Sequence, residues 1–230
     1  MSNAQTSKGP IKAVIFDMDG LLLDTEGIYT HVTNTIANRH GKTFDWSVKQ
    51  HSIGRGSQDF AEYVIRALEL PMSPEEFLTV RQPMLDERFP DAQPMHGAEA
   101  LVRHLAEHNI PIAVGTSSSM HYFNVKSSNH SAWFELFEHV VTADDPDVTA
   151  AKPAPDIFLV AARRLGVDPK HCLVFEDSPF GVTAAKTAGM FAVAVPDANM
   201  PADQYAHADL MLGSLADFPL QDWGLPGYRA

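Results

Sequence analysis

The sequence predicts an α/β protein in which a parallel β-sheet core is interrupted, after its first strand, by an inserted group of helices. Three observations carry this prediction. Short, almost continuously apolar runs alternate with helical patterns from residue 98 onward, as in a parallel sheet that helices cover on both faces. Only helical patterns occur over residues 25–92. A single strand pattern, residues 11–16, precedes those helices.

Composition and charge limit the classes of function. The 230 residues are 45% apolar, enough for one large domain or for a domain with a smaller one inserted. Lys and Arg number 17 and Asp and Glu number 29, which gives a net charge of −12. Such a surface repels nucleic acid and anionic membranes, so we expect neither as a partner. No apolar stretch reaches the roughly 18 residues that a membrane-spanning helix needs.

Cysteine usage indicates a reducing compartment. The only cysteine, Cys172, lies in an apolar run and is expected to be a buried thiol. One cysteine cannot form a disulfide within the chain, which favours a cytoplasmic protein. Residues 1–10 are polar and lack the apolar centre of a signal peptide, so we interpret them as a disordered lead or a tag remnant.

Residues 25–92 are expected to form a helical cap domain. The spacing of apolar residues predicts helices over residues 25–40, 59–70 and 73–89. The third begins with strong start signals, Ser73 as the cap and Pro74 at the first helical position. Pro83 lies inside this helix and is expected to kink it.

The α/β core domain is expected to comprise residues 11–24 and 93–230. Beyond the first strand, apolar runs predict strands over residues 110–114, 139–142, 172–175, 190–195 and 210–212. Helical spacing predicts helices over residues 98–105, 120–129, 156–165 and 179–188. Because strands and helices alternate, the sheet should be parallel.

Polar side chains follow four of the predicted strands. In chain order they are Asp17 and Asp19, Thr116 and Ser117, Lys152, and Glu176 and Asp177. The carboxyl ends of parallel strands meet at one edge of a sheet, where open α/β sheets bind their ligands. We therefore expect these side chains to converge.

The converging carboxylates suggest a metal-assisted reaction on a phosphate. Like charges at short range cannot all stay ionised without a counter-ion, and oxygen ligands without histidine or cysteine favour Mg²⁺. Lys152 and Thr116 add a cation and a hydroxyl that suit phosphate oxygens. One carboxylate can act as a covalent nucleophile while the other transfers protons.

Four short segments occur in a fixed order, each after a predicted strand. They are Asp17-Met18-Asp19-Gly20, Gly115-Thr116-Ser117-Ser118, Lys152-Pro153-Ala154-Pro155-Asp156 and Phe175-Glu176-Asp177-Ser178. Together they resemble the motifs of the haloacid dehalogenase-like (HAD) phosphohydrolases, and the resemblance covers about residues 11–220. It implies a Rossmann-like sheet, Mg²⁺ as the cofactor and a small phosphorylated metabolite as the partner. We expect a monomer or a weak dimer.

The resemblance also implies the catalytic and metal-binding roles. Asp17 would attack phosphorus and form an aspartyl-phosphate, and Asp19 would protonate the leaving alcohol and then activate water. Asp177, the Asp17 carboxylate and the main-chain carbonyl of Asp19 would hold Mg²⁺. Glu176 would support the metal, directly or through water.

For the phosphate, the resemblance implies contacts from several strand-end residues. Thr116 would donate a hydrogen bond and Lys152 would neutralise charge, with Met18 and Ser117 completing the subsite. Arg55, in the segment Gly54-Arg55-Gly56-Ser57, is a candidate to contact the substrate when the cap closes. Arg81 is a second candidate.

The position of the insert resembles the helical cap of the β-phosphoglucomutase-like subgroup. Within it, loop segments such as Val195-Pro196-Asp197 are most similar to pseudouridine-5′-phosphatase-type members. Sugar phosphomutases of this subgroup carry a cap histidine a few residues after the first motif. Tyr29 occupies that position here and His31 follows two residues later. The change favours a phosphatase. A sugar phosphomutase and a non-catalytic protein that binds phosphorylated metabolites remain the alternatives.

Overall fold

The computed structural model describes residues 11–228 and contains a six-stranded parallel sheet. The lead expected over residues 1–10 lies outside the described residues. The strand order is β3-β2-β1-β4-β5-β6, which places the first strand at the centre. The strands are β1 (Ala13–Phe16), β2 (Ile112–Gly115), β3 (His139–Val141), β4 (Cys172–Glu176), β5 (Phe191–Ala194) and β6 (Leu210–Met211). The parallel sheet with a helical insert is confirmed, and every strand begins or ends within two residues of its expected bounds.

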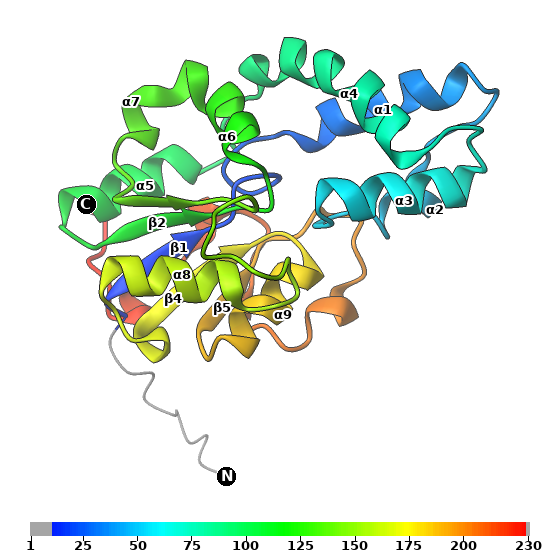
Figure 1. Cartoon of the computed structure of the whole chain (residues 1–230). Coiled ribbons are helices and arrows are strands. Elements are labelled where there is room, and N and C mark those ends of the chain that lie inside the picture. Colours follow the sequence, from blue (N-terminus) through cyan, green and yellow to red (C-terminus); the bar gives the residue numbers. More distant parts are fainter. Residues whose placement is uncertain (1–10, 229–230) are drawn as a thin grey trace.

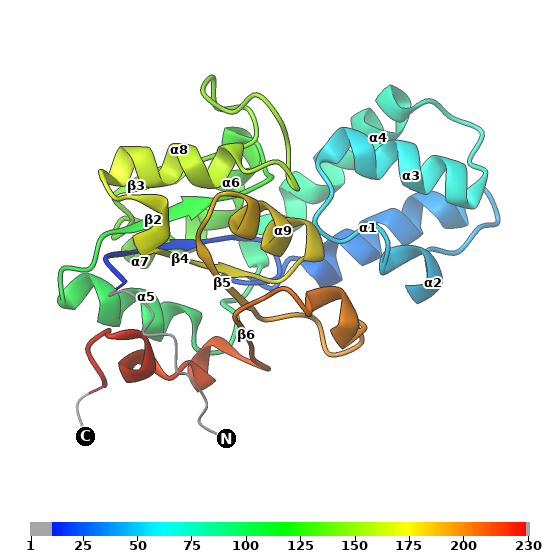
Figure 2. The same cartoon turned by 90° about the horizontal axis from the view of Figure 1, so that it is seen from below.

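Helices cover both faces of this sheet (Figures 1 and 2). Val14 and Phe16 pack with α5 (Ala98–Glu107) on one face, whereas Ala13 and Ile15 pack with α8 (Asp156–Leu165) and α9 (Pro179–Thr187) on the other. Figure 2 shows α8 and α9 opposite α5. Because alternate residues of β1 enter two different cores, the strand has no polar face, as its apolar sequence indicated.

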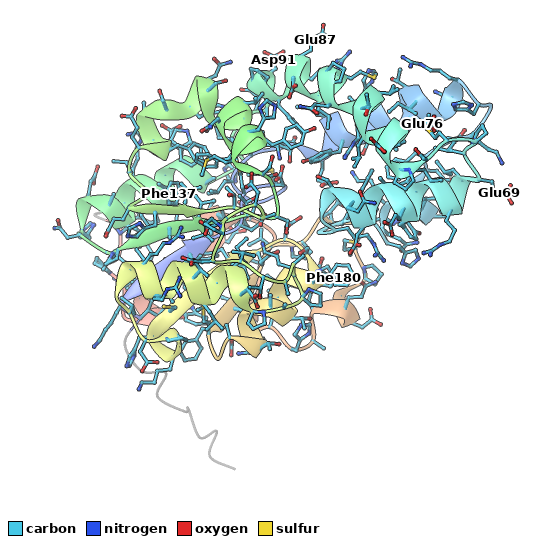
Figure 3. All side chains as sticks on the ribbon, viewed as in Figure 1. Glu69, Glu76, Glu87, Asp91, Phe137 and Phe180 are labelled. Carbon is cyan, nitrogen blue, oxygen red and sulfur yellow. The ribbon has the colours of Figure 1, made fainter. Side chains whose placement is uncertain are left out.

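The helical insert contains α1 (Glu26–Asn38), α2 (Trp46–Lys49), α3 (Ser57–Leu68) and α4 (Pro74–Arg88). It lies beside the α/β core (Figure 1) and has an apolar cluster of its own, which includes Phe44, Phe60 and Phe77. Charged residues such as Glu69 and Glu76 lie on its outer surface (Figure 3). The helical insert comprises residues 25–92, and its standing as a separate domain stays a prediction.

Local signals explain where α4 begins. The Ser73 hydroxyl accepts from the Glu76 N–H, and the Glu76 carboxylate accepts from the Ser73 N–H, which together form a capping box. The helix continues through Pro83 to Arg88.

Several short elements carried no periodic signal in the sequence. Two of them, α2 and α7 (Ser131–Phe134), are one turn long. The helix expected over residues 120–129 does form, as α6 (Met120–Ser127), but it ends earlier than expected. The 3₁₀ helices cover Phe89–Asp91, Ser128–His130, Pro169–His171, Ala202–Tyr205, Leu215–Asp217 and Leu220–Trp223. Elements of three or four residues are too short to show a helical repeat.

An aromatic stack fixes the carboxyl ends of the two central strands. Phe16 and Phe175 stack with their ring centroids 5.1 Å apart, and Phe137 meets Phe16 edge-on at 5.9 Å. Phe16 and Phe175 are fully buried. They immediately precede Asp17 and Glu176, so the packing of these rings sets where both carboxylates emerge.

We expect Phe16→Ala to lower the free energy of unfolding by about 3–5 kcal/mol, because it leaves a cavity between two buried rings. The change is measured by urea unfolding. Leu159→Ala on α8 is the control, since Leu159 is 39% exposed and an exposed truncation costs about 0.5 kcal/mol or less. Equal losses in the two variants would contradict this packing role.

Candidate active site

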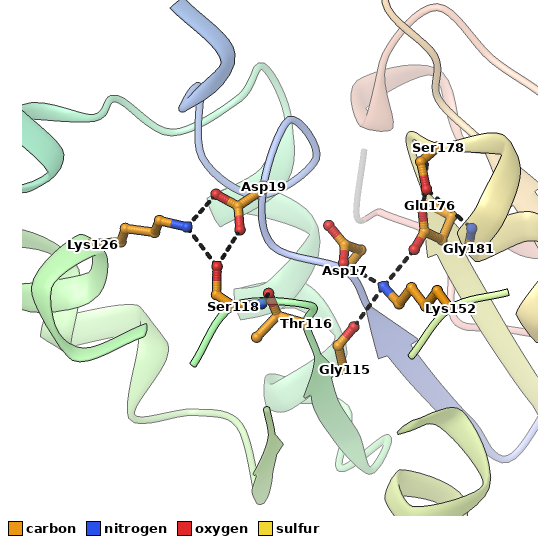
Figure 4. Close-up of polar contacts among 10 residues, drawn as sticks. All are labelled: Asp17, Asp19, Gly115, Thr116, Ser118, Lys126, Lys152, Glu176, Ser178 and Gly181. Atoms are coloured by element: carbon orange, nitrogen blue, oxygen red, sulfur yellow. Dashed lines mark hydrogen bonds and ion pairs between the residues drawn. The ribbon is translucent and has the colours of Figure 1, made fainter. Parts of the chain in front are cut away.

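Three carboxylates meet where β1 and β4 end, and Figure 4 shows two of them, Asp17 and Glu176. Asp17, Glu176 and Asp177 are buried, and each offers an oxygen atom within 4.8 Å of the others. The Asp17 N–H donates to the Phe175 carbonyl at 3.0 Å, so the hydrogen-bonding of the two strands continues to the first catalytic candidate. The sequence-based expectation that strand ends would gather these carboxylates agrees with this geometry.

Lys152 is the cation that holds two of these carboxylates together. Its Nζ donates to Asp17 Oδ1 and Glu176 Oε1, both at 2.6 Å, and to the Gly115 carbonyl at 3.0 Å. Lys152 is 8% exposed. It therefore ties the ends of three strands, β1, β2 and β4, to one ammonium group.

The two acidic residues after β4 have different surroundings. Glu176 Oε1 accepts from Lys152, and its Oε2 accepts from the N–H and the hydroxyl of Ser178, both at 2.9 Å. Within residues 11–228, no hydrogen bond or ion pair engages the Asp177 carboxylate. Asp177 is thus the carboxylate left available for a ligand.

Two glycines allow the chain to pass against this cluster. Gly20 has a φ of +75°, and a Cβ there would lie 2.7 Å from Asp177 Oδ2. A Cβ on Gly181 would overlap the Glu176 carboxyl group. The backbone approaches both carboxylates more closely than any larger residue permits.

The acidic cluster is short of positive charge. Burial, with Glu176 and Asp19 nearby, raises the pKa of Asp17 to about 7 despite Lys152. Burial and the neighbouring Glu176 and Asp17 raise the pKa of Asp177 well above its usual range. Burial opposes the charged form of Lys152, but Asp17 and Glu176 raise its pKa above the ordinary value. One lysine for three buried carboxylates, with oxygen donors only, fits a hard divalent cation such as Mg²⁺.

Asp19 lies in a separate hydrogen-bonded cluster beside the first (Figure 4). Its carboxylate accepts from Lys126 Nζ at 2.5 Å, from Thr25 at 2.7 Å and from Ser118 at 2.8 Å. Lys126 Nζ also donates to the Tyr29 hydroxyl at 2.9 Å. Although burial alone would raise the pKa of Asp19, Lys126 and the two hydroxyls lower it below the usual value.

Sequence reasoning missed Lys126. It is fully buried on α6, yet its neighbours in the chain form no motif and most lysines are exposed. Ser118 is the last residue of the second motif, and Thr25 comes five residues after the end of the first, so their place in or near those motifs was the available signal.

The residues expected at the phosphate take different positions. Thr116 is fully buried, and its hydroxyl accepts from the Ser118 N–H at 3.1 Å. Ser117 and Ser118 line the cavity beside the carboxylates. Met18 has its side chain in the apolar core, so only its main chain can face a ligand.

A cavity of about 640 Å³ lies between the sheet edge and the helical insert. Asp19, Asp177 and Ser117 line its core side, and Tyr29, Phe60 and Arg81 are among the residues on the insert side. This volume includes space that is open to solvent at the cavity mouth.

The insert touches the core at the mouth of this cavity. Gly54 has a φ of +78°, and a Cβ there would lie 2.5 Å from the Ser178 side chain. The Arg55 guanidinium lies 5.4 Å from the ring centroid of Phe180, which Figure 3 labels on α9 beside the insert. Arg55 also donates to the His51 carbonyl at 2.7 Å.

Comparison with known proteins decides the family. Residues 11–189 match the family "haloacid dehalogenase-like hydrolase". The chain belongs to this family. The suspected HAD membership is therefore confirmed, and the enzyme is a phosphoric monoester hydrolase of the HAD type.

Curated relatives of this HAD chain include phosphatases with different named substrates. It is 45% identical over 227 residues to (DL)-glycerol-3-phosphatase 1, mitochondrial, of Arabidopsis thaliana, covering 96% of this chain and 76% of that protein. It is also 45% identical over 217 residues to a probable pseudouridine-5′-phosphatase of Drosophila melanogaster, covering 93% and 94% of the two chains.

Solved structures share the fold of this HAD chain. CbbY from Rhodobacter sphaeroides, in complex with phosphate, matches with a TM-score of 0.78 and 24% identity over 94% of this chain and all of that chain. β-Phosphoglucomutase from Clostridium difficile matches with a TM-score of 0.79 and 22% identity, over 93% and 97% of the two chains. Across residues 11–228, no helix has the length and apolar character needed to cross a bilayer.

We expect Mg²⁺ to stabilise the protein more at pH 8 than at pH 5. The folded-state pKa of Asp17, about 7, lies above its ordinary value of 3.8, so metal-free stability falls as pH rises through that window. Protons occupy the cluster at pH 5 and compete with the metal. At a Mg²⁺ concentration about 100 times its Kd, the gain is about 2.7 kcal/mol, which raises Tm by about 5–10 °C.

The measurement is thermal unfolding with and without Mg²⁺ at the two pH values. Asp177→Asn should lose most of the pH 8 rise, because it removes the carboxylate without a protein partner. An equal rise at both pH values, or in Asp177→Asn, would argue against a cation at this cluster.

Proposed function

We propose that this HAD protein is a Mg²⁺-dependent phosphatase of small phosphorylated metabolites that works through a phospho-aspartate on Asp17. The observation that carries the proposal is the convergence of Asp17, Lys152, Asp177 and the Ser117 turn at one sheet edge, beside a cavity under the helical insert. In this proposal Asp17, Asp177 and the Asp19 carbonyl hold Mg²⁺. A bound Mg²⁺ supplies charge stabilisation to the phosphoryl oxygens.

In the first step, an Asp17 carboxylate oxygen attacks phosphorus and forms an O–P bond. The bond between phosphorus and the leaving oxygen breaks, and Asp19 gives that oxygen its proton. Lys152 sits 2.6 Å from Asp17 and offsets the charge of the approaching phosphate. In the second step, Asp19 takes a proton from water, whose oxygen attacks phosphorus, so inorganic phosphate leaves and Asp17 is regenerated.

The proposed acid and base roles of Asp19 require two arrangements of its side chain. Lys126, Thr25 and Ser118 stabilise its anion, which suits the base that activates water. To deliver a proton to the leaving group, Asp19 must detach from Lys126 and turn toward the substrate. Lys126 is therefore a positioning residue in this proposal.

Glu176 supports the site without direct metal contact in this proposal, because both of its oxygens already accept hydrogen bonds. Ser117 and the main chain of Met18 line the phosphate subsite, while Thr116 holds the turn that carries Ser117. Arg55 lines the cavity mouth. The relatives support glycerol 3-phosphate and pseudouridine 5′-phosphate as substrate candidates. A monomer or weak dimer in the cytoplasm stays a prediction.

The insert supports a phosphatase over a mutase. Tyr29 lines the cavity, whereas His31 is exposed on α1. Among the described residues that line the cavity there is no histidine. The feature that protects an aspartyl-phosphate from water in the mutases is therefore missing from this site.

Asp17→Asn should lower kcat for p-nitrophenyl phosphate by at least about 1,000-fold, because an amide is a poor nucleophile. Asp24→Asn is the matched control. Asp24 is an exposed carboxylate seven residues away, and its variant should retain parental activity. Circular dichroism checks that both variants fold. Parental activity in Asp17→Asn would refute the nucleophile, and an inactive parent would favour the non-catalytic alternative.

β-Glucose 1-phosphate should yield inorganic phosphate and glucose, since water has access to the intermediate. The products are separated by ³¹P NMR, with and without β-glucose 1,6-bisphosphate. Accumulation of glucose 6-phosphate would instead identify a mutase.

A further inference from the structure

Arg81 is a buried cation that the proposed phosphoryl chemistry does not use. It projects from α4, is 3% exposed, and lines the cavity beneath the insert. Its guanidinium carbon lies 4.3 Å from the ring centroid of Phe60 and 4.8 Å from that of Tyr29. Both rings line the same cavity. The aromatic faces stabilise its charge but accept few of its N–H donors.

The donors of Arg81 lack acceptors within residues 11–228. Its Nε is buried without a hydrogen-bond partner, and the ion pairs of the structure do not include it. A guanidinium has five N–H donors and no acceptor. Leaving such donors unpaired is unfavourable, and a ligand oxygen in the cavity would satisfy them.

The charges around the cavity limit the kind of ligand. Two lysines there are already in ion pairs: Lys49 pairs with Glu26 at 3.2 Å, and Lys126 pairs with Asp19. Arg55 donates through its Nε to the His51 carbonyl. Carboxylates and cations are equal in number across the cavity and the adjoining cluster. They are Asp17, Asp19, Glu26, Glu176 and Asp177 against Lys49, Arg55, Arg81, Lys126 and Lys152.

This balance has a direct consequence for the substrate. A phosphomonoester is mostly dianionic at neutral pH, and one divalent cation offsets that charge. The filled site is then neutral overall. A second anionic group on the substrate would leave one buried negative charge without compensation, beside Glu26 and Asp19, which is unfavourable.

We infer that Arg81 is a specificity-determining residue that donates hydrogen bonds to uncharged oxygens of the leaving group, so that the substrates are monophosphates of polyols, sugars or nucleosides without a second anionic group. This inference rests on the proposed phosphatase function and names its substrate class. The planar fork of the guanidinium can donate to two oxygens at once, and the charge balance of the site disfavours an anionic pair. The rings of Tyr29 and Phe60 pack against the guanidinium.

The test compares substrates that differ only in the leaving group. Glycerol 3-phosphate carries two hydroxyls, and n-propyl phosphate has the same three carbons without them. In 3-phosphoglycerate a carboxylate replaces the terminal hydroxymethyl group, and one hydroxyl remains. Pseudouridine 5′-phosphate is a second oxygen-bearing probe. For the parent, kcat/KM should be at least about tenfold higher for the better of the two oxygen-bearing probes than for n-propyl phosphate. It should also be higher than for 3-phosphoglycerate.

Arg81→Met should lose about 10–100-fold in kcat/KM on that preferred probe and clearly less on n-propyl phosphate, because only the former loses hydrogen bonds. Arg88→Met is the matched control, since Arg88 is an exposed arginine on the same helix. Arg81→Lys keeps the charge but lacks the fork and should reduce the same preference. If Arg81→Met fails to fold, Arg81→Lys is the variant that tests the role of Arg81.

Binding without turnover provides a second readout. In the Asp17→Asn background, Arg81→Met should weaken calorimetric binding of the preferred probe by about tenfold or more, with a smaller effect on inorganic phosphate. An equal loss on all ligands, or no loss, would overturn the role of Arg81. Preference for 3-phosphoglycerate would overturn the neutral leaving group. A different result would refute the proposed phosphatase function: a parent protein that shows no Mg²⁺-dependent hydrolysis of p-nitrophenyl phosphate.

Discussion

The contact on which the site depends is the ammonium group of Lys152 between Asp17 and Glu176. Both distances are 2.6 Å, and all three side chains are buried. Without this cation the carboxylates would repel one another in a medium that screens charge poorly. Since the same nitrogen also donates to the Gly115 carbonyl, one residue ties the ends of three strands to a single point. The sheet and the chemistry are thus coupled through a lysine that comes from a loop.

The two aspartates of the first motif differ in pKa because different residues surround their carboxylates. Burial, assisted by the neighbouring carboxylates of Glu176 and Asp19, raises the pKa of Asp17 to about 7. Asp19, two residues later, accepts from Lys126, Thr25 and Ser118, which lower its pKa. Gly20 then turns the chain beside Asp177 with a positive φ. One short turn therefore separates Asp17, which shares the ammonium group of Lys152 with Glu176, from Asp19, which has Lys126 as its own cation.

The helical insert forms one wall of the cavity, and in the proposed function it contributes no residue to the phosphoryl transfer. Its Gly54 fits against Ser178 with no room for a Cβ, so the two parts approach closely at the cavity mouth. Tyr29, Phe60 and Arg81 form the opposite wall. In the proposed function, the phosphoryl chemistry resides in the core and recognition of the leaving group resides in the insert.

Much of the architecture was accessible from local patterns. The unbroken apolar strands indicated a parallel sheet, and the order of strand-end residues indicated where Asp17, Lys152 and Asp177 would meet. One-turn elements such as α2 escaped prediction because four residues show no period. Lys126 was not predicted as a site residue, because a lysine on a helix is expected to be exposed unless the elements that pack around it are known. Nothing local to α6 predicts that its ammonium group reaches a carboxylate 107 residues away.

By itself the sequence determined the fold class, the position of the insert and the carboxylates at the strand ends, because each is encoded in hydrophobic periodicity or in residues adjacent to a strand. Only the tertiary structure decided how those carboxylates differ. Their pKa values depend on burial and on cations from distant parts of the chain, Lys152 for Asp17 and Lys126 for Asp19. It also decided that Tyr29 faces the cavity while His31 faces outward, since the direction of a helix face is set by what the helix packs against.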